Sequence, residues 1–243
     1  MSLPPSFKGT ALITGGAQRI GKYISLHLAS LGYSVALHYH QSHDEAKKTA
    51  LEIMKKGGEC KIFHCDLTLE KKTMSLIPNV LKLFPELNLL INNASIFYKS
   101  NLKSGAINDF NRHFAINLKA PYILTRQFAK LCRKGQIINI LDTNISKNKI
   151  THLSYLLSKK SLGDLTKLAA VELAPDIRVN AIAPGLILPP LGEKNTYLSR
   201  LTKSVPLKKR GAPSYIMSAI QFLLENDYLT GQIIFEDGGE HLV

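Results

Sequence analysis

The sequence predicts an α/β fold in which about seven parallel strands form a doubly wound sheet with helices on both faces. Short apolar segments rich in β-branched residues alternate along the chain with longer segments whose apolar residues recur at helical spacing. Such alternation is typical of βαβ units, whose parallel strands are buried on both faces. With 243 residues, the chain is long enough for one well-buried domain over residues 1–243 but short for two.

The first two strand–helix units have the clearest boundaries. Residues Thr10–Thr14 form a short apolar run, and the helical spacing that follows the next turn ends at Gly32. A second strand over 34–39 leads to Ser42 and Glu45, which match a capping box for a helix that ends at the next glycine pair. The N-terminal part is therefore predicted to be βαβα.

The alternation continues to the C-terminus. A third strand runs through Ile62 to Asp66, further strands are predicted at 87–92, 136–141, 177–183 and 232–236, and helices near 106–132, 152–174 and 213–225. Residues 185–205 fit neither pattern and follow the carboxyl end of a strand, where open α/β sheets bind their ligands. We expect this segment to be a substrate lid.

A glycine-containing turn follows the first strand. Residues 14–21 read Thr-Gly-Gly-Ala-Gln-Arg-Ile-Gly. A glycine turn that opens a helix lets backbone N–H groups approach a pyrophosphate at the positive end of the helix. A turn kept only for tight packing is the alternative, but the strand before it and the helix after it favour a dinucleotide site.

The end of the second strand indicates which nicotinamide cofactor is preferred. An acidic residue here would bind the ribose 2′-hydroxyl of NAD, whereas a cation would bind the 2′-phosphate of NADP. No carboxylate occurs before Asp44, while Arg19 in the glycine turn, with His40 and Ser42, could bind a phosphate. We therefore expect NADPH. A solvent-facing Arg19 is the alternative, although a cation in a first helical turn opposes the helix dipole.

Tyr155 and Lys159 are spaced i, i+4 on a predicted helix, so their side chains share one face. An ammonium near a phenol favours the phenolate and lowers the tyrosine pKa, which would make the phenol a usable general acid. The pair follows the fifth predicted strand. We expect it to deliver a proton.

Composition excludes several other classes of protein. The formal net charge is +13, but the lysines are scattered in pairs without an aromatic–basic platform, so we expect no nucleic-acid partner. The sequence shows no signal-peptide pattern and no long apolar run, so we expect neither a signal peptide nor a membrane span, and the three cysteines show no pairing pattern. The histidines lack ligand spacing, so we expect no metal site. These features predict a cytoplasmic protein with buried thiols.

Over essentially its full length the chain resembles the short-chain dehydrogenase/reductase family, which has a Rossmann-like fold. The matching stretches are Thr14–Gly21, Asp66-Leu67, Asn92-Asn93-Ala94, Asn117, Tyr155 with Lys159, Arg178-Val179-Asn180, Pro184-Gly185 and Asp237-Gly238-Gly239. The resemblance implies that Asn117 belongs to the catalytic relay, that Lys159 binds the nicotinamide ribose and that Asp66 contacts the adenine. It also implies a homotetramer. We expect the cofactor to be held by Gly15, Arg19, Ile20, Gly21, His40, Gln41, Ser42, Asp66, Leu67, Asn93, Ala94, Lys159, Pro184 and Gly185.

Three departures from the usual family pattern resemble the pteridine reductase branch. Asp142 stands 13 residues before Tyr155, where the family usually has its catalytic serine. Arg19 replaces the middle glycine of the turn, and Ser95 replaces the last glycine of Asn-Asn-Ala-Gly. The resemblance implies that Phe97 stacks the pterin against nicotinamide and that Asp142 and Tyr155 act together in protonation. The branch often has arginine at the position of Gln41, which implies weaker NADPH binding here.

Asp142 suits a pterin on physical grounds. A carboxylate can accept hydrogen bonds from an amino-pyrimidine edge, whereas beside a plain ketone it would repel the developing oxyanion. The alternatives are that Asp142 only caps the loop after its strand, and that Phe97 is an ordinary core residue. We expect the substrate to be bound by Ser95, Phe97, Asp142 and Tyr155, with catalysis by Asp142, Tyr155, Lys159 and Asn117.

The sequence therefore predicts an NADPH-dependent reductase of an oxidised pterin or dihydrofolate-like ring. Hydride would reach a ring carbon, and Tyr155 would protonate the adjacent nitrogen. Two other functions remain open. One is a carbonyl reductase, for example of 3-oxoacyl thioesters, for which the fold and Tyr155 would serve equally. The other is a non-catalytic NADPH-binding regulator, because a fold alone does not establish activity.

Overall fold

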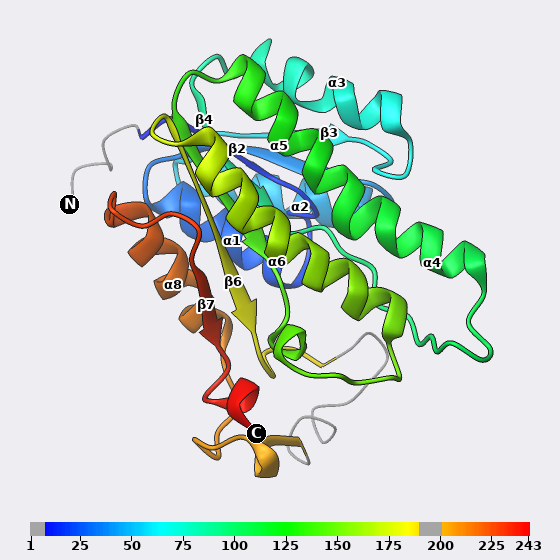
Figure 1. Cartoon of the computed structure of the whole chain (residues 1–243). Coiled ribbons are helices and arrows are strands. Elements are labelled where there is room, and N and C mark those ends of the chain that lie inside the picture. Colours follow the sequence, from blue (N-terminus) through cyan, green and yellow to red (C-terminus); the bar gives the residue numbers. More distant parts are fainter. Residues whose placement is uncertain (1–7, 190–200) are drawn as a thin grey trace.

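The computed structural model describes residues 8–189 and 201–243. Within these ranges seven strands form one sheet, in the order β3-β2-β1-β4-β5-β6-β7 (Figure 1). Every neighbouring pair is parallel. The strands are β1 Thr10–Ile13, β2 Ser34–Tyr39, β3 Cys60–His64, β4 Leu87–Asn92, β5 Gly135–Ile140, β6 Ile177–Pro184 and β7 Ile233–Glu236. The predicted doubly wound α/β fold is confirmed.

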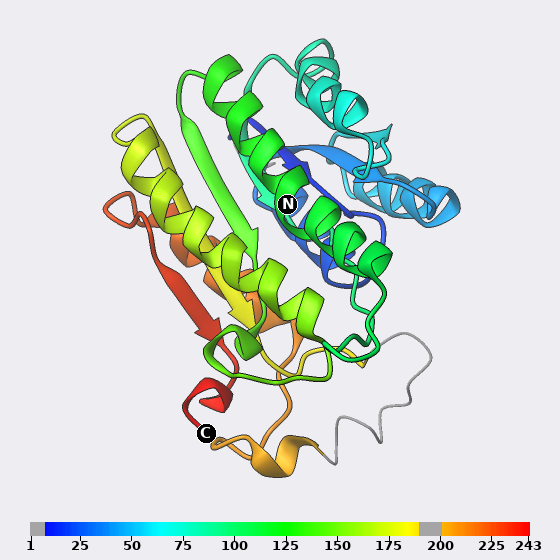
Figure 2. The ribbon, with the colours of Figure 1, turned by 45° about the vertical axis from the view of Figure 1, so that its right-hand side comes forward.

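Helices cover both faces of the sheet because successive strand residues point to opposite sides. Ala11 and Ile13 of β1 belong to one hydrophobic cluster, and Leu12 between them belongs to another. The first cluster packs against α1 Arg19–Ser30, α2 His43–Lys55 and α8 Pro213–Glu225. The second packs against α3 Glu70–Leu81, α5 Ala120–Leu131 and α6 Leu153–Leu173, and Figure 2 shows α5 and α6 side by side.

The predicted helix over 106–132 is interrupted. The chain forms α4 over Ile107–Phe114, a π-helical turn over Ala115–Lys119, and then α5. The π turn contains Asn117, which is fully buried and hydrogen-bonds to the backbone of Ile96. Such turns are rare and concentrate at functional sites. The predicted helix near 106–132 is therefore confirmed in its bounds, and the π turn, which was not predicted, forms where the polar Asn117 side chain points inward.

One helix was missed by the sequence analysis, and one predicted cap differs. The helix α3 was not predicted, and it forms with Pro78 inside it, a residue that usually kinks or ends a helix. Ser42 does precede α2 at the N-cap position, but its side chain makes no capping hydrogen bond. The start of α2 is stabilised instead by Asp44 and Glu45 in its first turn, because their negative charges complement the helix dipole.

The cysteines Cys60, Cys65 and Cys132 are all free and buried, as predicted. Burial raises the pKa of each thiol, to about 12 for Cys60 and about 11 for the other two. They are therefore protonated core residues at neutral pH. Across 8–189 and 201–243, no helix is both long and apolar enough to cross a membrane.

Candidate functional site

The predicted site residues gather at the carboxyl edge of the sheet. Because all strands of the sheet are parallel, the loops after β1, β2, β4, β5 and β6 leave from the same edge. The strand order changes direction between β1 and β4, which are neighbours in space but not in sequence. Open α/β sheets bind ligands in the crevice at such a switch point.

The glycine turn lies at this point and is tightly packed. Gly15 has φ = 63°, a left-handed conformation that favours glycine. A Cβ added to Gly21 would lie 2.0 Å from the Gly15 carbonyl oxygen. Tight packing, the alternative to a dinucleotide site in the sequence analysis, therefore explains part of the glycine pattern. The turn also brings the N-terminus of α1 to the carboxyl edge of the sheet. The N-cap residue Gln18 makes no side-chain hydrogen bond to that N-terminus.

Thr14 and Asn93 link the loops after β1 and β4. The Thr14 hydroxyl accepts hydrogen bonds from the backbone N–H groups of Asn93 and Ala94, at 2.9 and 3.0 Å. The Asn93 amide donates in return to the carbonyls of Thr14 and Gly15, at 2.8 and 3.1 Å. The Asn93 amide N–H groups thus hold the turn in place, and the assignment of Asn93 to the cofactor site stays a prediction.

His38 holds the same turn from β2, and sequence reasoning did not assign it a role. The Gly15 N–H donates to its Nδ1 at 3.0 Å, and Nε2 lies 3.0 Å from the Cys65 carbonyl oxygen. Burial lowers the pKa of His38 to about 4, so the ring is neutral at pH 7 and Nε2 carries the proton. A histidine inside an otherwise apolar buried strand was the available signal.

Arg19 lies half-buried beside the turn. It has φ = 52°, where side chains are uncommon, and its guanidinium donates to the Pro189 carbonyl at 2.7 Å. The solvent-facing alternative is therefore wrong. A guanidinium has five N–H donors, so this one bond leaves donors that can bind an anion. Arg19 thus links the start of α1 to the start of the predicted lid.

The residues predicted to bind the adenosine end lie after β2 and β3. Gln41 is exposed and Ser42 is half-buried, and His40 Nε2 lies 3.7 Å from Asp66 Oδ2. Although burial of Asp66 acts in the opposite direction, hydrogen bonds from Thr68 keep its pKa below the ordinary value. Leu67 beside it is buried. The structure therefore brings His40 and Asp66 together at one side of the crevice.

Asp142 and Tyr155 form the central pair of the site. The Tyr155 hydroxyl donates to Asp142 Oδ2 at 2.7 Å. The other oxygen, Oδ1, accepts from the backbone N–H and the side-chain amide of Asn144, each at 2.7 Å. Asp142 therefore does cap the loop after β5, but it does not only cap it. Tyr155 is buried, whereas Asp142 is partly exposed.

Lys159 lies on the same helix as Tyr155 but does not lower its pKa. Burial raises the pKa of Tyr155 well above the ordinary value, and the charge and hydrogen bond of Asp142 raise it further. The Lys159 ammonium instead donates to the Ile140 carbonyl at 2.7 Å, and burial lowers its pKa to about 8. The prediction that Lys159 favours a phenolate was therefore wrong, because burial and Asp142 both stabilise the protonated phenol.

Asn117 connects the π turn to the loop after β4. Its Oδ1 accepts from the Ile96 N–H at 3.0 Å and from the Ser95 hydroxyl at 3.2 Å. Its amide donates to the Ile96 carbonyl and to Ser158 Oγ, both at 3.1 Å. Ser158, in turn, donates to the Tyr155 carbonyl at 2.6 Å. The buried Asn117 thus joins the loop that carries Ser95 to the helix that carries Tyr155.

Phe97 is 44% exposed, so it is not an ordinary core residue. Its ring stacks on His152 with a centroid separation of 4.1 Å and meets the Tyr155 ring edge-on at 4.7 Å. Burial lowers the pKa of His152, and the nearby Lys99 acts in the same direction. An uncharged aromatic pair therefore lies beside the Asp142–Tyr155 pair.

Pro184 and Gly185 end β6 at the same edge. A Cβ on Gly185 would lie 2.7 Å from Asp237 Cβ, so this strand end and the end of β7 approach closely. Of the predicted lid at 185–205, residues 190–200 lie outside the described residues. In the described ranges no group of three or more histidine, cysteine, aspartate or glutamate side chains could hold a metal ion.

Comparison with known proteins gives two kinds of relative. A model of the family described as enoyl-(acyl carrier protein) reductase matches residues 15–241. The chain is 31% identical over 236 residues to the 3-oxoacyl-[acyl-carrier-protein] reductase of Synechocystis sp., covering 94% of this chain and 95% of that protein. Its structure is similar to that of FolM alternative dihydrofolate reductase 1 from Brucella canis complexed with NADP. That pair has a TM-score of 0.93 and 35% identity, and covers 100% of this chain and 97% of the other. The structure of FolM alternative dihydrofolate reductase 1 from Brucella suis in complex with NADP is also similar, with a TM-score of 0.93 and 36% identity. That match covers 97% of this chain and 96% of the other.

Neutral His38 makes stability depend on pH. Its folded pKa of about 4 lies below the ordinary 6.5, so the unfolded chain binds more protons between these values. The free energy of unfolding should therefore fall by about 3 kcal/mol as pH decreases through this window. Urea unfolding at a series of pH values measures it. In His38→Asn, which keeps an acceptor for Gly15, this dependence should be much weaker, and an unchanged slope would contradict the assignment.

Proposed function

The chain belongs to the short-chain dehydrogenase/reductase family, and from this we propose that it is an NADPH-dependent reductase of oxidised pterins or dihydrofolate-like rings. The observation on which the choice of substrate rests is the 2.7 Å hydrogen bond from Tyr155 to Asp142. It places a carboxylate beside the proton donor. The similarity to two NADP-bound alternative dihydrofolate reductases supports the same choice.

The residues of the switch point fit a dinucleotide. A Cβ on Gly21 would lie 2.0 Å from the Gly15 carbonyl oxygen and one on Gly15 would lie 3.1 Å from Ala94 Cα, so the tight turn that opens α1 requires glycine at Gly21 and favours it at Gly15. No acidic residue occurs in the first turn of α1, which leaves its positive end suitable for a pyrophosphate. We propose that the cofactor is held by the residues predicted from the sequence, which are Gly15, Arg19, Ile20, Gly21, His40, Gln41, Ser42, Asp66, Leu67, Asn93, Ala94, Lys159, Pro184 and Gly185.

The adenosine end favours the phosphorylated cofactor. Asp44 is the nearest carboxylate after β2 in the sequence, and its side chain is 82% exposed and lies 3.8 Å from His43. It is therefore turned to solvent and does not replace the ribose-binding acid of NAD enzymes. Arg19, His40 and Ser42 supply donors for a 2′-phosphate.

When bound, NADPH supplies the hydride that reduces the ring carbon. The protein supplies the proton from the Tyr155 hydroxyl. Because burial and Asp142 together raise the pKa of this phenol, the site holds its proton until an acceptor of higher affinity, such as a ring nitrogen that gains electron density, lies beside it. The buried Lys159 ammonium attracts Asp142 and offsets the negative charge that is left when the proton departs.

Asp142 also has room for one substrate donor. An ionised carboxylate oxygen accepts about two hydrogen bonds. The two bonds from Asn144 fill Oδ1, and Tyr155 takes one position on Oδ2. The remaining position can accept an N–H of an amino-pyrimidine edge next to the Tyr155 hydroxyl. We propose that Phe97 provides an exposed aromatic face for the flat ring and that Ser95 contacts the same ring.

The second candidate is a 3-oxoacyl thioester reductase. The sequence relatives with that activity favour it, and Tyr155 would serve a ketone equally. Asp142 opposes it, because a carboxylate close to a developing oxyanion raises the energy of the transition state. The two candidates therefore predict different substrates for one site.

We also propose a homotetramer in a reducing, cytoplasmic environment. The three buried free cysteines are compatible with that environment. Leu157, Leu168 and Val171 share one face of α6 and are 41%, 70% and 82% exposed. Because an apolar stripe of this kind is typical of a helix that packs against another chain, α6 is a suitable interface in a symmetric assembly.

The reductase assignment is tested by following NADPH absorbance with purified protein. Dihydrobiopterin or dihydrofolate should be reduced, an acetoacetyl thioester should not, and NADH should be a poorer donor. Tyr155→Phe should lower kcat by roughly a hundredfold or more, because it removes the proton donor, while NADPH binding is retained. Turnover of the thioester alone would favour the second candidate, and full activity of Tyr155→Phe would exclude the phenol as proton source.

Arg19→Gly tests the choice of cofactor. The variant relieves the left-handed strain and removes the guanidinium, so KM for NADPH should rise by roughly tenfold or more while KM for NADH changes little. Lys22→Met is the matched control, because it removes one positive charge from the same helix at a side chain that pairs with Glu52. An equal rise of KM for NADPH in both variants would show only that lowering the positive charge of α1 weakens cofactor binding.

Leu168→Glu combined with Val171→Glu tests the interface. The molar mass measured by light scattering should fall below that of the wild-type assembly, because two charges would be buried between copies. Leu83→Glu is the matched control, since Leu83 is 59% exposed and follows the end of α3, outside α6. A wild-type chain that is already monomeric would contradict the tetramer.

A further inference from the structure

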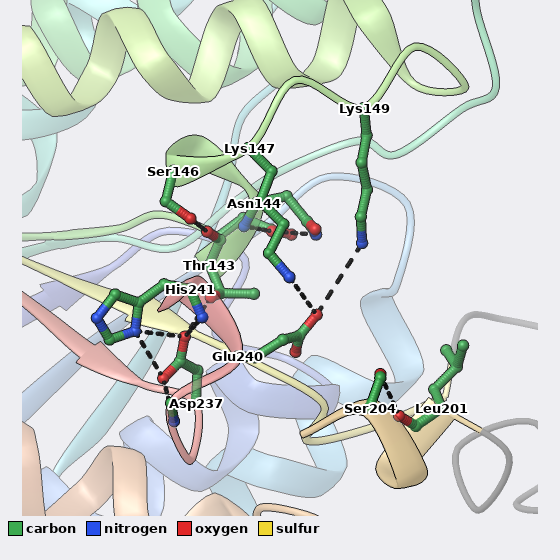
Figure 3. Close-up of polar contacts among 12 residues, drawn as sticks. Thr143, Asn144, Ser146, Lys147, Lys149, Leu201, Ser204, Asp237, Glu240 and His241 are labelled. Atoms are coloured by element: carbon green, nitrogen blue, oxygen red, sulfur yellow. Dashed lines mark hydrogen bonds and ion pairs between the residues drawn. The ribbon is translucent and has the colours of Figure 1, made fainter. Parts of the chain in front are cut away.

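The Asp237-Gly238-Gly239 stretch has no role in the proposed function, although it lies at the carboxyl edge of the sheet directly after β7. Gly238 and Gly239 have φ values of 64° and 86°, which let the chain turn back on itself. A short 3-10 turn over Glu240–Leu242 follows. Figure 3 shows this C-terminal turn packed against the segment that follows β5.

Asp237 is buried and accepts hydrogen bonds from several directions. The backbone N–H groups of Gly239 and His241 donate to it at 2.9 and 2.7 Å, and His241 Nδ1 lies 2.9 Å from Oδ2. The Thr143 hydroxyl donates to the same Oδ2. Although burial acts in the opposite direction, these hydrogen bonds hold the pKa of Asp237 below its ordinary value. Asp237 is thus a fixed anion at neutral pH.

Thr143 connects this anion to the proposed catalytic pair. It directly follows Asp142 and begins the 3-10 turn Thr143–Ser146. Asn144 in the same turn donates both hydrogen bonds to Asp142 Oδ1, and so fixes the plane of the carboxylate. In this orientation Oδ2 accepts the hydrogen bond from the Tyr155 hydroxyl. Any rotation of the turn would therefore move the acceptor of the Tyr155 proton.

Glu240 makes a second, weaker contact with the same segment. Its Oε1 lies 3.7 Å from the Lys147 ammonium and 4.0 Å from that of Lys149, both beyond hydrogen-bonding distance. Burial raises the pKa of Glu240 against the effect of these lysines, and its Oε2 has no hydrogen-bond partner among the described residues. The directional link between the two turns is therefore the one from Thr143 to Asp237.

We propose that Asp237 is a positioning residue for the Asp142–Tyr155 pair and acts through the Thr143 hydroxyl. The C-terminal turn supplies a fixed anion, Thr143 fixes the first residue of the 3-10 turn to it, and Asn144 then orients Asp142. The catalytic consequence rests on the proposed function. The structural consequence does not: burial raises the pKa of Tyr155, and Asp142 adds to that effect while the turn keeps its carboxylate beside the phenol.

Thr143→Val tests the link because it removes the donor with little change in shape. We expect kcat to fall by roughly tenfold with KM for NADPH unchanged, since the cofactor residues are untouched. Thr143→Ser, which keeps the hydroxyl, should retain activity. Asp237→Asn, which keeps the shape but not the charge, should behave like Thr143→Val and serves as a second variant if that protein folds poorly.

A readout independent of turnover follows the phenol directly. In protein labelled with 13C-tyrosine, the Tyr155 resonance is assigned by its loss in Tyr155→Phe. It should titrate at a lower pH in Thr143→Val than in wild type, because Asp142 no longer favours the protonated phenol. The other titratable groups near Tyr155 are Lys159 and His152 of the same helix region and His113 of α4, and none of them changes in the variant.

Thr166→Val is the matched control. Thr166 is fully buried in α6, and its hydroxyl donates to Leu162 and accepts from Asn139. Its loss should lower the free energy of unfolding without moving the Tyr155 titration. If Thr143→Val also lowered only stability, leaving kcat and the titration as in wild type, Asp237 would have a purely structural role. An inactive wild type would refute the proposed function, and the titration would still decide the positioning role.

Discussion

The seam between β1 and β4 is the constraint on which the site depends. These strands are adjacent in the sheet but lie far apart in the sequence, and the loops that leave them diverge. Thr14 and Asn93 exchange hydrogen bonds across the seam, and His38 fixes Gly15 from the next strand. Because backbone groups and neutral side chains make all of these bonds, the seam keeps the glycine turn rigid without placing a negative charge near a phosphate.

The sequence predicts the sheet well because its signals are local. Apolar runs bounded by turn residues identify the strands, and α8 begins at Pro213, where a proline is favourable in a first helical turn. Two features depended on tertiary contacts. The helix α3 forms around Pro78 because Leu76, Ile77 and Val80 are buried against the sheet. The π turn exists because Asn117 bonds to the Ile96 backbone, and nothing in the spacing of the sequence indicates an extra residue there.

Among the site residues, the positions were predictable from local patterns, but their contacts and pKa shifts were not. The spacing of Tyr155 and Lys159 correctly places both on α6, yet the direction of the tyrosine pKa was wrong, because it depends on where Lys159 and Asp142 point and on how deeply the phenol is buried. The contact of Arg19 with Pro189 spans most of the chain, and no local pattern contains it. Residue types at the carboxyl edge were predictable from the sequence, whereas their electrostatic coupling required the three-dimensional arrangement.

Similarity over the whole chain does not decide between the two candidate substrates. An oxoacyl reductase and an alternative dihydrofolate reductase, at 31% and 35% identity, both match nearly the full length. Most of that length forms the sheet, its helices and the nucleotide-binding turn, which serve hydride transfer to either substrate. The discriminating property is the charge beside the proton donor. Either substrate gains negative charge on the atom that Tyr155 would protonate, which a nearby carboxylate opposes. Only a pterin also presents N–H donors that Asp142 can accept, and these hydrogen bonds offset the repulsion.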